Sequence, residues 1–355
     1  MKKVLLILML LSVLIVKPAF SQNDTIDSPM ISVDTLQQDF GLFTNDEILN
    51  LSFRFDITEY RRKKPKEEYL KAVLTYHINE HDSVNKEIKL KSRGIMRNEY
   101  CDFPPIKLNF GKDDFQQSDL SKIDKMKMVT HCKSGNEAYL LKEYLVYKLY
   151  NVLTENSFRV RLVKVDYINT AKKSKPIETY AFLIEPIEIL AGRTNSVPVN
   201  SLKLSQKNIV PEIMDRMAIF NYMIGNTDWS VPNLHNCKIL SGLTLNNSGL
   251  GIIVPYDFDY SGLVNTDYAI PYEGLGLKSV RERRYVGICR SEDVFINALR
   301  EFTDKKEEFY KVINNFPLLN AKTKKDMIEY LDTFYREFDK RNTIVYNLLG
   351  GCNKF

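Results

Sequence analysis

The chain has 355 residues and a formal net charge of +5, with 44% hydrophobic residues and 11% aromatic residues. This charge is too balanced to imply nucleic-acid binding by the whole domain, and the chain is long enough to bury a sizeable core. Its five cysteines show no CxxC spacing and its four histidines form no HExxH motif, which argues against a structural zinc site.

The first 21 residues, MKKVLLILMLLSVLIVKPAFS, have a basic start, an apolar run and small residues near their end. This order predicts a cleaved secretory signal peptide at 1–21, because the apolar run is too short for a comfortable membrane span. We therefore expect a secreted or periplasmic protein without a stable membrane span after cleavage. A retained anchor is the alternative.

Residues 22–40 are polar and indicate a loose leader before a first lobe at 41–190. Strand-like alternation recurs in ILNLSFRFDI, YLKAVLTYHI, KEIKLKSRGI, PPIKLNF and KMKMVTH. NEAYLLKEYLVYKLYNVLT then predicts one helix with a wide apolar face, and FRVRLVKVDYI and ETYAFLIEP predict a hairpin. The pattern favours an antiparallel sheet with one inserted helix, and the basic run RRKKPKE at 61–67 is interpreted as a solvated loop between strands.

The second lobe, 191–355, is predicted to be mostly helical. PEIMDRMAIFNYMIG begins with proline and ends with glycine, as helices commonly do, and further helices are expected at 292–315 and 322–349. NCKIL and GIIVPY predict a second hairpin. The fold class expected from these elements is α+β, with a mostly β N-lobe and a mostly α C-lobe.

Three oxygen-bearing side chains are expected to meet at this second hairpin. Asp228 and Asn233 lie in the loop after the helix, and Asp257 follows the last strand. The hairpin should return Asp257 to this loop, and Asp259 should share its face if the strand stays regular. We expect Asp257 to sit deepest. Hard oxygen ligands of this kind suit Mg²⁺ or Mn²⁺.

A phosphoryl-transfer site also needs a cation for the nucleotide phosphates. Lys127 precedes the helix that carries Glu143, so we expect this lysine to pair with Glu143 beneath the nucleotide. Lys107, on the neighbouring strand, is the alternative. The serial order of lysine, glutamate, Asp-x4-Asn and the final Asp is that of protein kinases.

The sequence resembles the secreted, atypical kinase-like proteins of the CotH spore-coat kinase family and, more distantly, HipA-type kinases. The resemblance is carried by SRGIMRNEYCDFPPIKLNF, KMVTHC, EYLVYKLYN, SFRVRLVKVDY, FLIE, IGNTDWSVPNLHN and VPYDFDYSG. It implies a two-lobed protein-kinase-like fold, ATP as the nucleotide, Asp228 as the catalytic-loop acid, and Asn233 with Asp257 as metal ligands. The acceptor, a protein or a cell-surface hydroxyl, is not implied by the family.

Two other functions stay open. A catalytically inactive pseudokinase that acts as a binding or scaffold module is favoured by the absence of a GxGxxG phosphate loop. Another divalent-metal enzyme, a hydrolase or a DxD-type transferase, could use Asp257 and Asp259. Separately, Cys101 and Cys132 each flank a strand segment, and we expect a disulfide between them outside the cytoplasm.

Overall fold

The computed structural model describes residues 41–77, 83–111, 124–201, 203–242, 249–339 and 343–353. The signal peptide and the leader expected at 1–21 and 22–40 lie outside the described residues. In the parts of the chain that are described, no helix has both the length and the apolar character needed to cross a bilayer.

Seven strands form a closed barrel in the order β1-β2-β3-β4-β5-β7-β6. Side chains alternate across its wall: on β3, Ile88 and Leu90 point inward while Glu87 and Lys89 are exposed. The interior holds a cluster of large rings that includes Phe55, which meets the Tyr60 and Tyr167 rings edge to face. The strands are β1 (Leu49–Phe55), β2 (Leu70–His77), β3 (Ser83–Ser92), β4 (Ile106–Asn109), β5 (Lys125–Val129), β6 (Val160–Asn169) and β7 (Ile177–Ile184).

The expected two-lobed kinase-like fold, with an antiparallel sheet as its first lobe, is wrong. The barrel closes where β1 pairs in parallel with β6, from Leu49 opposite Val163 to Phe55 opposite Asn169. This pairing makes the sheet mixed and leaves it without a free edge. The fold is α+β and contains a barrel. Alternation of apolar residues predicted most strands but carries no information on which distant strand becomes the neighbour.

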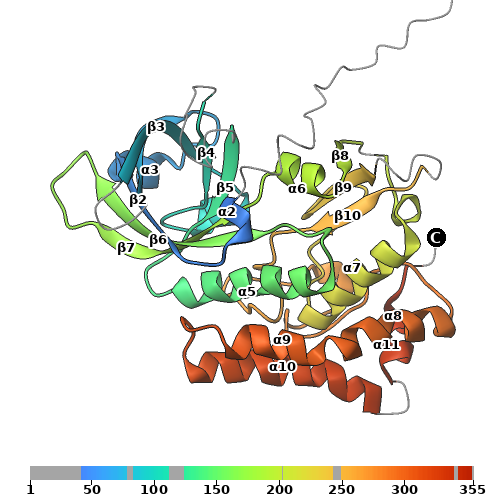
Figure 1. Cartoon of the computed structure of the whole chain (residues 1–355). Coiled ribbons are helices and arrows are strands. Elements are labelled where there is room, and N and C mark those ends of the chain that lie inside the picture. The colour runs from blue at the N-terminus through green and yellow to red at the C-terminus, as the bar shows by residue number, and fades with distance from the viewer. Residues whose placement is uncertain are drawn as a thin grey trace, which may run out of the picture.

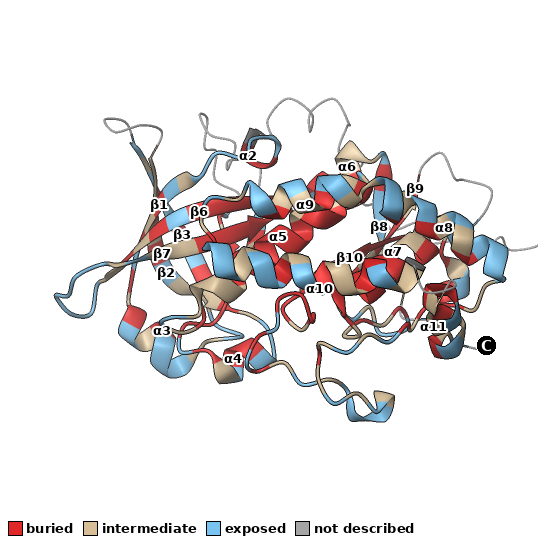
Figure 2. Ribbon diagram, turned by 90° about the horizontal axis from the view of Figure 1, so that it is seen from below, coloured by how far each residue is buried: buried red, intermediate tan, exposed pale blue. Residues whose placement is uncertain are grey.

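The predicted central helix is α5 (Glu137–Leu153), which contacts β6 and β7 of the barrel on one side and α9 on the other (Figure 1). Apolar and aromatic side chains surround it, as expected of a helix buried on most faces. Figure 2 shows it largely buried. Short helix α2 (Gly41–Thr44) precedes β1, and α3 (Ile57–Lys63), α4 (Met96–Tyr100) and α6 (Ile187–Arg193) connect strands. The basic run at 61–67 thus begins in a helix and is not wholly a loop.

The predicted helix before the Asp228 loop is α7 (Pro211–Ile224), with proline in its first turn. Gly225 ends it with a φ of 67°, and a Cβ there would clash with Tyr330, so glycine fits this position best. The C-terminal helices are α8 (Glu292–Asp304), α9 (Lys306–Asn314), α10 (Ala321–Asp339) and α11 (Thr343–Gly351), with 3₁₀ turns η1 (Gln206–Asn208) and η2 (Glu273–Leu275). The helix expected at 292–315 is divided at Lys305.

The second predicted hairpin is confirmed. β9 (Cys237–Gly242) and β10 (Ile252–Pro255) pair antiparallel, with Cys237 opposite Pro255. A third strand, β8 (Ser196–Val199), which was not predicted, adds to β9 and completes a three-stranded sheet.

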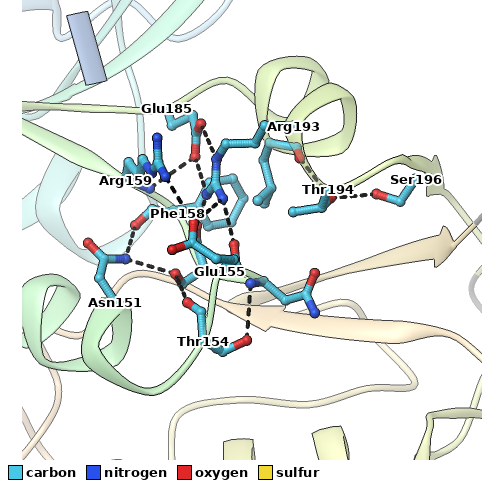
Figure 3. A network of polar contacts seen from close by, with 12 residues as sticks. Asn151, Thr154, Glu155, Phe158, Arg159, Glu185, Arg193, Thr194 and Ser196 are labelled. Atoms are coloured by element: carbon cyan, nitrogen blue, oxygen red, sulfur yellow. Dashed lines mark hydrogen bonds and ion pairs between the residues drawn. The ribbon is translucent and has the colours of Figure 1, made fainter. Parts of the chain in front are cut away.

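A network of polar contacts joins the end of β7, α6 and the loop after α5 (Figure 3). The Arg193 guanidinium donates to both oxygens of Glu185, at 2.8 and 2.9 Å, and to the backbone carbonyl of Glu155. Glu185 is 2% exposed and also accepts from the backbone N–H of Arg159. Bidentate pairs of this type have a defined geometry, so the network fixes α6 relative to the end of β7 and the loop between α5 and β6.

The expected disulfide between Cys101 and Cys132 is present, with the Cα atoms 4.6 Å apart. A second disulfide joins Cys289 to Cys352 and ties the segment before α8 to the end of α11. Cys237 is buried and free.

Candidate functional site

The β9–β10 hairpin brings two loops side by side, as the sequence predicted. The first loop, 225–236, carries Asp228, and the second, 256–263, carries Asp257 and Asp259. Backbone hydrogen bonds join them: Tyr256 N–H donates to the Asn236 carbonyl at 2.9 Å, and Gly262 N–H donates to the Gly225 carbonyl at 3.0 Å. The position of Asp257 is therefore fixed relative to the Asp228 loop.

Asp228 is held by hydrogen bonds while its carboxylate stays accessible, with 36% of the side chain exposed. His235 Nε2 lies 2.8 Å from Oδ1, and Asn236 Nδ2 donates to Oδ2 and to the backbone carbonyl, each at 2.8 Å. Asn226 accepts from the Asp228 N–H. An exposed carboxylate with a fixed orientation can accept a proton from a substrate hydroxyl or orient that hydroxyl.

Asn236, which was not among the predicted site residues, holds Asp228 in place, whereas Asn233 was predicted to bind the metal ion with Asp257. Asn233 is exposed and makes no side-chain hydrogen bond within the described residues. Both Leu234 and Asn236 have a positive φ, 49° and 50°, so the loop turns sharply after Asn233. The sequence shows Asn236 eight residues after Asp228, but it does not predict the turn that brings this asparagine into contact with Asp228.

Three carboxylates converge from α5 and the second loop. One oxygen each from Glu143, Asp257 and Asp259 lies within 4.8 Å of the others. The chain does not continue as a regular strand here, because β10 ends at Pro255 and Asp257 has a φ of 65°. Asp257 N–H donates to Tyr147 Oη of α5 at 2.8 Å, which secures this unusual backbone.

The expectation that Asp257 sits deepest is wrong. Its side chain is 25% exposed, whereas that of Asp259 is 7% exposed. The reason is Phe258, which is fully buried and packs edge to face on the Tyr147 and Phe220 rings. Because the φ of Asp257 is positive, the backbone turns at this residue, and the relative depths cannot be read from strand alternation.

Arg97, on the short helix α4, is the ion-pair partner of Glu143, so the expected pairing of Lys127 with Glu143 is wrong. Its guanidinium donates to Glu143 Oε2, to Asp259 Oδ2 at 2.8 Å and to Tyr268 Oη at 3.1 Å. Tyr268 Oη in turn donates to Asp259. Arg97 is 8% exposed, so these charges meet almost without solvent. Arg97 lies in the stretch SRGIMRNEY, but no pattern in that stretch predicted that it would contact a residue of α5.

Lys127 is affected by the charge of Asp257. Its Nζ is 4.0 Å from the centre of the Tyr256 ring. Lys107 lies opposite Lys127 in the β4–β5 register, on the same wall of the barrel. Burial and, to a smaller extent, the charge of Arg93 together lower the pKa of Lys127 to about 7, against the attraction of Asp257. The pKa of Lys107 is also lowered by burial and neighbouring lysines.

The three carboxylates differ in their pKa values. Burial raises the pKa of Asp257, but Arg93, Arg97 and Lys127 outweigh this effect and hold the pKa below its ordinary value. Arg93 Nη2 lies 3.6 Å from Asp257. For Glu143, burial prevails over Arg97 and raises the pKa to about 8, and burial also raises the pKa of Asp259. Asp257 is therefore the most acidic of the three.

The donor atoms of this cluster fit a divalent cation. All three are carboxylate oxygens, which Mg²⁺ and Mn²⁺ prefer, and Glu143 Oε1 is buried without a hydrogen-bond partner among the described residues. An orphaned buried carboxylate oxygen is costly unless a cation satisfies it. Arg97 already compensates the other oxygen of Glu143 and Asp259 Oδ2, so a metal ion would share these ligands with a guanidinium.

Comparison with known proteins gives no relative on which to base a function: no protein-family model and no curated protein matches the sequence. The resemblance to the CotH family therefore stays a prediction that rests on the motifs quoted above. The carboxylate cluster and the Asp228 loop are the features from which a function can be argued.

Proposed function

We propose that the protein transfers the γ-phosphoryl group of ATP, with Mg²⁺ or Mn²⁺, to a hydroxyl group of a protein or cell-surface acceptor. The observation that carries this proposal is the convergence of Glu143, Asp257 and Asp259 within 4.8 Å, beside a loop that presents Asp228. Phosphoryl transfer needs positioning and charge neutralisation more than covalent chemistry by the protein.

In this proposal each group of side chains has a separate role. Asp257, Asp259 and Glu143 would hold a metal ion, which would supply charge neutralisation at the phosphates. Arg93 and Lys127 place positive charge beside Asp257, where the phosphate oxygens of a nucleotide would need it. Asp228, oriented by Asn236 and His235, accepts the proton of the acceptor hydroxyl.

We place this activity outside the cytoplasm. Two disulfides among the described residues support this location, since disulfides persist in oxidising compartments and are rare in the cytosol. The acceptor is then a secreted or surface molecule.

The test is incubation of the purified protein with γ-phosphate-labelled ATP and Mg²⁺ or Mn²⁺, followed by detection of covalent label on the protein or on an added acceptor. Asp228→Asn should remove the label and leave nucleotide binding largely intact, because Asp228 contacts the acceptor. Asp304→Asn, at an exposed position of α8, is the matched control and should label like the parent. Equal labelling of parent and Asp228→Asn would contradict the proposal.

A second candidate, a binding or scaffold module without catalysis, is favoured by one observation. Arg97 neutralises Glu143 and Asp259 within the protein itself, so the buried acids have partial compensation without a metal ion. This candidate predicts that neither Mg²⁺ nor ATP changes the midpoint of thermal unfolding, whereas phosphoryl transfer predicts stabilisation by both together.

A further inference from the structure

A basic pocket lies on the barrel, apart from the carboxylate cluster. Its volume is about 630 Å³, within the range of small-molecule sites. Five cations and one acid line it: Arg61, Arg62, Lys64, Lys172, Lys175 and Asp102. The cations come from α3 and its C-cap and from the turn between β6 and β7, and Asp102 lies between α4 and β4. Figure 1 shows α3 at the barrel end of the molecule, away from the helices α8 to α11.

Most of these cations are unpaired. Within the described residues, no carboxylate lies within ion-pair distance of Arg61, Arg62, Lys172 or Lys175, and all four are exposed. Lys64 donates to the backbone carbonyl of Glu99 at 3.1 Å, which fixes its position without neutralising it. Because the chain as a whole is nearly balanced in charge, this local excess of positive charge is not a property of the entire surface.

The two basic segments are held at a fixed separation. Asn169, at the end of β6, accepts from the N–H of Ile57 at 3.2 Å and from the N–H of Ala171 at 3.1 Å. Its amide donates to Thr58 Oγ1 at 3.0 Å. One side chain thus joins the start of α3 to the start of the β6–β7 turn, so the pocket is formed before any ligand arrives.

The most deeply buried lining residue, Tyr167, is uncharged. Tyr167 is fully buried, and its hydroxyl has no hydrogen-bond partner among the described residues. Burial raises the pKa of Tyr167 far above its ordinary value, so the hydroxyl keeps its proton and adds no negative charge beside the cations.

We propose that this pocket binds a small anion that carries at least two phosphate groups. The planar guanidinium groups of Arg61 and Arg62 match phosphate oxygens in pairs, and the lysines of the facing turn supply the charge for a second group. A single small ion would leave most of the volume and half of the cations unused. This inference does not rest on the proposed phosphoryl transfer.

The experiment is calorimetric titration of inorganic pyrophosphate into the full chain. The pocket variant, Arg61→Gln with Lys175→Gln, removes one cation from each side, and we expect its affinity to fall about tenfold or more. The matched control, Arg300→Gln with Lys322→Gln, removes the same two residue types from exposed positions of α8 and α10 and should bind like the parent. Lys175→Gln alone, in an exposed turn, should lose affinity to a smaller extent while leaving thermal unfolding unchanged.

Three results would overturn the proposal. The first is no pyrophosphate binding by the parent. The second is an equal loss in the control pair, which would assign the effect to overall charge. The third is binding of citrate or sulfate as tight as that of pyrophosphate, which would remove the phosphate assignment. Binding should also survive in Asp257→Asn, so failure of the carboxylate site and failure of the basic pocket are distinguishable.

Discussion

Asn236 Nδ2 donates to both the Oδ2 atom and the backbone carbonyl of Asp228, each at 2.8 Å. This pair joins the two loops of the candidate site, because the backbone carbonyl of Asn236 accepts from Tyr256 N–H immediately before Asp257. One asparagine therefore sets the orientation of Asp228 and its placement relative to the carboxylate cluster.

Replacement of Asn236 by Ala should reduce phosphoryl transfer about 10- to 100-fold, mainly in kcat, because Asp228 loses two hydrogen bonds that fix its orientation. Steady-state kinetics of transfer measures this effect. Asn233→Ala is the matched control, and its kinetics should equal those of the parent. A larger loss in Asn233→Ala than in Asn236→Ala would contradict the assignment.

Replacement of Arg97 by Met should destabilise the protein by about 3–5 kcal/mol, because Glu143 and Asp259 would remain buried without their counterion. Urea unfolding measures the free energy. Adding Glu143→Gln to this variant removes one of the uncompensated charges and should restore part of the loss. Arg300→Met, at an exposed helical position, should change stability by about 0.5 kcal/mol or less.

The sequence predicted the local structure well and the long-range pairing poorly. Alternating residues in KEIKLKS and the apolar faces around α5 and α7 led to the right elements, because local periodicity reflects which side chains are buried. The parallel pairing of β1 with β6 has no local signal, so the barrel was missed. The loops that carry Asp228 and Asp257 lie side by side because of the β9–β10 hairpin, which the short-range pattern did predict.

Within the site, backbone turns set side-chain positions that the sequence pattern did not predict. The positive φ of Asp257 turns the backbone between the two acids, and the turn at Leu234 and Asn236 places Asn236 against Asp228. Arg97 reaches Glu143 from a short helix whose position depends on the closed barrel. Each of these positions depends on tertiary structure, which the spacing of residues in the sequence does not predict.

Stability should fall as the pH decreases from about 6.5 to about 4. Burial lowers the pKa of His131 to about 4, so in this range the unfolded chain binds a proton that the folded protein does not. The loss is about 3 kcal/mol at most below pH 4. His131→Phe keeps a ring beside Phe103 and should show a flatter pH profile of the unfolding free energy over this window. Parallel profiles for the parent and the variant would contradict this explanation.

Removal of the Cys101–Cys132 disulfide by double replacement with Ser should lower the free energy of unfolding by about 2–4 kcal/mol, since the bond closes a loop in the unfolded chain. Thermal unfolding under non-reducing conditions measures the loss. Treatment of the double variant with a reductant should then have a smaller effect than on the parent. An unchanged unfolding midpoint in the variant would show that the bond does not stabilise the fold.

The most direct test of the central claim, that the carboxylate cluster binds a divalent metal ion, is a titration of Mn²⁺ followed by electron paramagnetic resonance of the free ion. We expect saturable binding by the parent and a loss of affinity of at least about 100-fold in Asp257→Asn, which removes the most acidic and most accessible ligand of the cluster. The exposed control Asp304→Asn should bind Mn²⁺ like the parent. Equal Mn²⁺ affinity in the parent and in Asp257→Asn, or no binding by the parent with or without ATP, would contradict the account.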